Sequence, residues 1–152
     1  MQRIFFDTLP NHFNTETTFE TVVPIDAVDE ESFMQRTFNQ WGFDDASNWN
    51  AFFDDLFDFS WLDGIKSVVM SHNGVPTFMY WERYFDVLIH ALYRHENHVL
   101  MNIPDYGQPK LFAKFNTKDW EYYLSHIDKR SLKRLEYLLA DETTRVFDKE
   151  LF

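Results

Sequence analysis

The sequence predicts an α/β fold with a small, three-stranded, mainly parallel sheet packed with helices. Three observations predict this class. Residues 65–70 (IKSVVM) are a continuous apolar run typical of a buried strand, and residues 99–103 (VLMNI) indicate another strand. Between them, residues 77–95 carry apolar side chains at helical spacing. Strands that alternate with helices pair in parallel and are covered by those helices.

The earlier elements follow from local signals. Residues 4–9 (IFFDTL) are rich in aromatic and β-branched residues and predict a short strand or arm. A second strand is expected at residues 20–25. Residues 30–41 predict a helix that Asp29 caps and Gly42 ends.

The later elements are mostly helical. Residues 110–115 (KLFAKF) fit either a short strand or a loop. Helices are expected at residues 116–126 and 131–140, each after a capping residue or a turn. We therefore expect one domain over residues 1–152, with its core at about 20–104 and a mostly helical C-terminal extension from about 105 to 152.

Composition limits the function classes. The chain has 152 residues, 45% hydrophobic and 19% aromatic, which is ample for a core, and no cysteine, which excludes disulfides and thiolate chemistry. We see neither a signal-peptide pattern nor an apolar stretch approaching the roughly 20 residues of a membrane span. These features predict a cytoplasmic protein without a membrane contact.

The negative charge is concentrated in one part of the chain. Residues 1–63 hold 13 acids and two bases, a net charge of −11, whereas residues 64–152 hold 12 of each and are neutral. A field of one sign speeds association with a basic partner and repels nucleic acid. The plain alternative is that these acids only provide solubility.

Residues 43–62 predict a short helix with two opposed faces. Asn50, Asp54 and Asp58 follow one another at intervals of four with no lysine or arginine to pair them, and like charges at this spacing repel. Such a row lowers stability, so it indicates a use. Either Ser47 or Asn48 can cap the first turn, and the small Ala51 allows a partner to approach closely. The opposite, apolar half comprises Trp49, Phe52, Phe53, Leu56, Phe57 and Phe59.

Motifs for common chemistries are missing from the sequence. Its four glycines form neither a dinucleotide-binding nor a phosphate-binding loop, and we find no nucleophile elbow or HExxH pair. Histidines 90, 95 and 98 are conceivable metal ligands, and Asp54 and Asp58 are conceivable acid/base or Mg²⁺ groups. The simpler explanation for the histidines is that the helix dipole stabilises positive charge near a helix C-terminus. The simpler explanation for the aspartates is that they lie on a solvated helix face. We expect no enzyme activity, cofactor or metal, but a metal-dependent enzyme stays open as an alternative.

The acidic helix resembles a segment of barstar-type ribonuclease inhibitors. The similar residues are Asn48-Trp49-Asn50-Ala51, then Asp54 and Leu56, then residues 58–62 (DFSWL). The order of predicted elements is similar too, over about residues 20–104. The resemblance implies a barstar-like fold and an intracellular immunity protein, without activity of its own, that blocks the active site of a cationic ribonuclease toxin.

The resemblance also implies roles for individual residues. Asp54 matches the key aspartate, which takes the place of the substrate phosphate and pairs with the enzyme's cationic side chains. Asn48 matches a contact residue at the helix start, and Ala51 lies between the contact rows. The chain departs from the pattern at two places. Asn50 replaces an aspartate, and Asp44, Asp45 and Ala46 replace a Tyr-Tyr-Gly or Tyr-Phe-Gly loop. These four residues and Asp58, which completes the acidic row, are also expected to bind the partner.

These departures leave the partner's identity open. The leading expectation is a monomeric toxin-antitoxin-type inhibitor of a basic nuclease. The alternative is a barstar-fold interaction or regulatory module for a basic partner that is not a nuclease.

Overall fold

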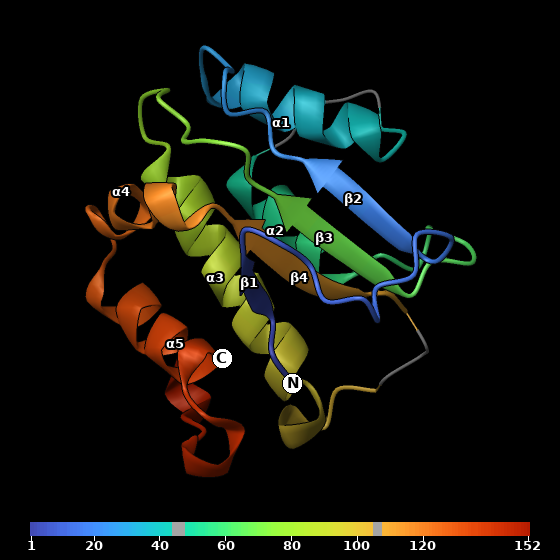
Figure 1. Cartoon of the computed structure of the whole chain (residues 1–152), viewed down its shortest axis with the longest axis vertical. Helices are drawn as coiled ribbons and strands as arrows, with labels where there is room; N and C mark the ends of the chain where they lie inside the picture. The colour runs from blue at the N-terminus through green and yellow to red at the C-terminus, as the bar shows by residue number, and fades with distance from the viewer. Residues whose placement is uncertain (44–47, 105–107) are drawn as a thin grey trace.

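The computed structural model describes residues 1–43, 48–104 and 108–152, and it has the predicted α/β class (Figure 1). Its sheet has four strands rather than three, in the order β1-β4-β3-β2, and every neighbouring pair is parallel. The strands are β1 Ile4–Phe6, β2 Thr18–Val22, β3 Ser67–Ser71 and β4 Lys110–Phe115.

The prediction of a strand at residues 99–103 is wrong. Val99–Met101 form a 3₁₀ turn, η1, in which Val99 and Leu100 are 67% and 59% exposed, and Asn102 follows with a left-handed backbone. Besides β2, the strand that pairs with β3 is β4, which comes from the stretch that fitted either a strand or a loop. Apolar composition is similar in the two stretches, but pairing with a neighbour defines a strand.

The five α-helices of the described ranges begin and end largely where local signals place them. They are α1 Glu30–Gln40, α2 Trp49–Phe57, α3 Glu82–Asn97, α4 Trp120–Leu124 and α5 Lys129–Leu139. The Asp29 side chain caps α1 by accepting the Ser32 N–H at 2.7 Å, as predicted. The helix expected from residue 77 starts later, because Tyr80 has a positive φ of 68° that a helix does not allow. None of the helices in the described ranges is both long and apolar enough to cross a membrane.

The two faces of the sheet are covered differently. Side chains that alternate along the strands face a large core shared with the helices, and Figure 1 shows α2 and α3 behind the sheet. On the other face, residues 7–17 cross from β1 to β2, and Phe13 packs on Phe5 and Phe112 with ring centres 5.4 and 4.9 Å apart. This crossover runs in the opposite direction and on the opposite face to the helical ones, so all crossovers share one hand.

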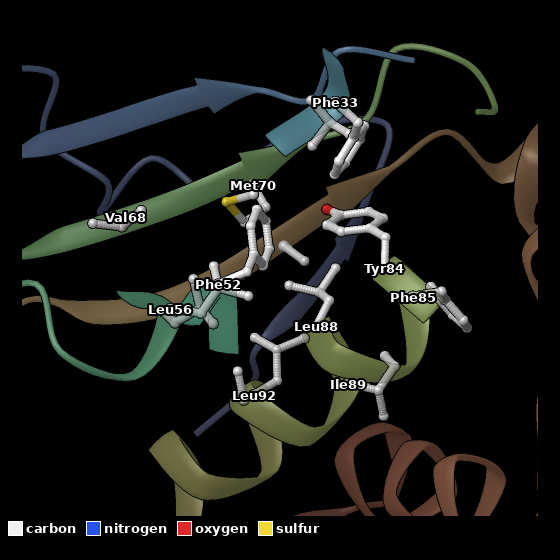
Figure 2. Close-up of a cluster of buried hydrophobic side chains, with 14 of the residues drawn as sticks. Phe33, Phe52, Leu56, Val68, Met70, Tyr84, Phe85, Leu88, Ile89 and Leu92 are labelled. Atoms are coloured by element: carbon white, nitrogen blue, oxygen red, sulfur yellow. The ribbon is translucent and has the colours of Figure 1, made fainter. Parts of the chain in front are cut away.

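The core fixes the place of α2. Phe52 and Leu56 of α2 are fully buried, between the sheet and α3 (Figure 2). The surrounding side chains, all fully or almost fully buried, come from α1, β3 and α3: Phe33, Val68, Met70, Tyr84, Phe85, Leu88, Ile89 and Leu92. Because α2 inserts two large side chains here, its opposite face must point away from the core.

A buried ion cluster ties distant parts of the chain to the end of α3. Arg145 donates to the Glu96 carboxylate at 2.7 Å and Arg3 donates to it at 3.4 Å. All three side chains are less than 10% exposed. One carboxylate therefore serves two guanidinium groups, from the segment before β1 and from the segment after α5.

Candidate functional site

The start of α2 is well defined. Asn48 has an extended backbone and its side-chain oxygen accepts the Ala51 N–H at 2.9 Å, so Asn48 is the capping residue of the two that the sequence allowed. The expected partner-binding residues Asp44, Asp45 and Ala46, and the other possible cap, Ser47, lie outside the described residues.

The end of α2 comes before Asp58. The helix stops at Phe57, and Asp58 is extended, with its backbone N–H bonded to the Asp54 carbonyl at 3.1 Å. The Asp58 carboxylate accepts the Ser60 N–H at 2.9 Å and so also orders the following turn. The predicted row of three polar residues thus has Asn50 and Asp54 on the helix and Asp58 at its C-cap.

The two predicted faces of this helix are present. Asn50, Asp54 and Asp58 are exposed, and Ala51 and Asp55 are intermediate. Phe52, Leu56 and Phe59 are fully buried. Trp49, Phe53 and Phe57 are partly buried at the flanks rather than in the core.

The carboxylates of Asp54, Asp55 and Asp58 lie close enough to one another for their charges to interact. Within the described ranges, no lysine or arginine forms an ion pair with Asp54, Asp55 or Asp58. Partial burial raises the pKa of Asp55, and the charges of Asp54 and Asp58 raise it further. The negative charge of this face is therefore available to a partner, at some expense in stability.

Arg94 of α3 is a cation near this face that sequence reasoning missed. Its guanidinium carbon lies 4.6 Å from the ring centre of Phe57 and 5.3 Å from that of Phe53, the residue before Asp54. Burial lowers the pKa of Arg94, and the charge of Asp54 partly opposes that shift. Sequence offered only a weak signal, a basic residue on α3 whose contact with α2 depends on how two distant helices pack.

Histidines 90 and 95 of α3, and His98 at its C-cap, take part in packing. The His90 ring lies 4.7 Å from the Phe53 ring and bonds to the Phe152 carbonyl. His95 donates to the Leu56 carbonyl at 2.8 Å, and His98 donates to the His95 carbonyl at 2.9 Å. In the portion of the chain that the structure describes, no three histidine, aspartate or glutamate side chains gather as a metal site.

This arrangement can bind positive charge. Exposed carboxylates on a short, capped helix accept charge-assisted hydrogen bonds from arginine or lysine, and a rigid helix presents them with little loss of conformational freedom. Comparisons of the chain with protein-family models, with curated proteins and with solved structures found no match.

Proposed function

We propose that this protein is a cytoplasmic inhibitor, of the immunity type, that blocks the active site of a cationic ribonuclease with α2 and the loop before it. The observation that carries the proposal is Asp54: an exposed carboxylate, without an ion pair in the described ranges, on a helix whose other side is locked into the core. The resemblance of residues 48–62 to barstar-type inhibitors supports the same role for Asp54.

The chemistry of a nuclease site favours this assignment. An enzyme that cleaves a phosphodiester supplies arginine, lysine and histidine donors where the phosphate binds. A carboxylate such as Asp54 satisfies the same donors but offers no bond to cleave. Under this proposal the inhibitor has no activity of its own, needs no cofactor, and binds as a monomer.

Asn50 defines how this chain would differ from its proposed relatives. The exposed amide of Asn50 is neutral. Its hydrogen bond to a cation is therefore weaker than the bond that a carboxylate would accept. Asp54 is therefore expected to contribute more to binding than any other residue of the helix.

An inhibition assay tests the proposal. RNA cleavage by a basic microbial ribonuclease of the barnase type, and by any small basic protein that co-purifies with the chain, is measured with increasing inhibitor. Stoichiometric inhibition by the wild-type chain that Asp54→Asn weakens supports the proposal. Capture of a basic partner that is not a nuclease, with no inhibition of any ribonuclease tested, would instead favour an adaptor role.

A further inference from the structure

Helix α2 requires support from outside itself. It has nine residues, fewer than the roughly 12–15 that an isolated helix needs to be even marginally stable in water. Phe52 and Leu56 are its only fully buried residues, while Phe53 and Phe57 are partly buried along one flank. The direction in which Asp54 points therefore depends on what packs against this flank.

Arg94 packs there in an unusual way. Its guanidinium lies over three rings, those of Phe53 and Phe57 on α2 and that of Phe152, the last at 4.6 Å. Its Nε is buried and has no hydrogen-bond partner among the residues that the structure describes. Planar guanidinium groups stack well on aromatic faces, so the rings rather than a carboxylate hold this side chain.

Phe152 is itself held firmly from the side of α3 and α5. His90 bonds to its carbonyl, and Arg134 donates to the Leu151 carbonyl at 2.7 Å. Arg130 donates to the Glu150 carbonyl, also at 2.7 Å. Three consecutive carbonyls are thus bound by three side chains, which fixes the Phe152 ring against Arg94.

We propose that Arg94 and Phe152 form a clamp that positions α2, so that the segment after α5 helps to set the direction in which Asp54 meets a partner. Arg94 is a positioning residue in this arrangement. It connects the segment after α5 to the flank of α2, next to Asp54. The proposed effect on partner binding rests on the function proposed above, whereas the effect on α2 itself does not.

Hydrogen–deuterium exchange tests the clamp without any partner. We expect Phe152→Ala and Arg94→Met each to speed amide exchange in residues 49–57 by roughly fivefold, because short helices open locally when flank contacts are lost. Exchange in β3 should stay unchanged. The double variant should be little worse than either single one, since both remove the same clamp.

Val146→Ala is the matched control, because Val146 lies in the same segment and is 84% exposed. It should leave exchange in α2 unchanged. Unchanged exchange in α2 for both Phe152→Ala and Arg94→Met would overturn the proposal. A uniform increase over all helices and strands would do the same, because it would show a loss of global stability only.

Binding kinetics with a barnase-type ribonuclease then test the functional part. We expect Phe152→Ala to speed dissociation by roughly fivefold and to leave the association rate unchanged, because it alters the pose of α2 but no charge. If the wild-type chain fails to bind while exchange in α2 responds as expected, the proposed function fails and the clamp stands. Dissociation that Phe152→Ala leaves unaltered would overturn the proposed effect of the clamp on partner binding.

Discussion

Two buried histidines make the protein sensitive to acid. His72 donates its Nδ1–H to the Lys114 carbonyl at 2.8 Å and accepts the Tyr84 hydroxyl on Nε2 at 2.6 Å. His95 donates its Nε2–H to the Leu56 carbonyl and accepts the Leu111 N–H on Nδ1 at 3.3 Å. Each ring is neutral and uses both nitrogens, and burial lowers the pKa of both to about 3.

Folding stability depends on pH because the two histidines have a lower pKa in the folded protein than in the unfolded chain. An unfolded histidine has a pKa of about 6.5, so between about pH 6.5 and 3 the unfolded chain binds protons that the folded protein excludes. Stability therefore falls as the pH falls, by about 1.4 kcal/mol per pH unit for each histidine. Between pH 7 and 5 each histidine lowers the free energy of unfolding by about 2 kcal/mol. This is a large share of the roughly 5–15 kcal/mol that is typical of a folded protein. The raised pKa values of Asp55 and Asp86 oppose part of this loss.

His95→Gln isolates the contribution of one ring. Glutamine keeps an N–H that can reach the Leu56 carbonyl but does not titrate in this range. The variant should be less stable than the wild type at pH 7, and the gap should narrow by about 2 kcal/mol by pH 5. Urea unfolding of both proteins at several pH values measures this gap. Parallel stability curves would refute the assignment of a neutral, buried His95.

Three further substitutions test other parts of the structure. Glu96→Gln removes the carboxylate shared by two buried guanidinium groups and should lower the unfolding free energy in urea by about 3–5 kcal/mol, against at most about 0.5 kcal/mol for the exposed control Glu31→Gln. Asp55→Asn should raise the thermal midpoint at pH 7, because the raised pKa of Asp55 means that its ionised form destabilises the folded protein. The gain in midpoint should shrink as the pH falls toward about 4 and Asp55 becomes protonated, and a gain that stays constant would contradict this cause. Asn48→Ala removes the cap of α2 and should reduce stability by about 1 kcal/mol, measured by urea unfolding, while Asn48→Asp should show no such loss.

Local signals predicted much of the fold. Asp29, Gly42 and the helical apolar spacing placed α1 and most of α3, because caps and periodicity act over a few residues. The predictions were wrong where pairing with a strand far away in the sequence decides whether a stretch forms a strand. Residues 99–103 and 110–115 are both apolar, and only the second finds β3 as a neighbour. The stretch predicted as a short strand or arm became β1, but its pairing with β4 joins residues 109 positions apart, which no local pattern reveals.

In the candidate site, too, local features were predicted from the sequence and contacts between distant segments were not. The exposure of Asn50 and Asp54, the cap at Asn48 and the burial of Phe52 all follow from helical periodicity. Arg94 was beyond reach, because its position over Phe53 and Phe57 depends on the packing of α3 against α2. The faces of α2 and its cap were thus predictable from the sequence, but its contact with a side chain of another helix was not.

The proposed role of Asp54 is tested most directly by the affinity of a barnase-type ribonuclease for the wild-type chain and for Asp54→Asn. The matched control is Glu121→Gln, which makes the same change of charge at an exposed residue of α4. We expect Asp54→Asn to weaken binding by at least about 2 kcal/mol, roughly thirtyfold in Kd, and Glu121→Gln to alter it by less than about threefold. Equal affinity of the wild type and Asp54→Asn would contradict the proposal that Asp54 occupies the phosphate site of a ribonuclease.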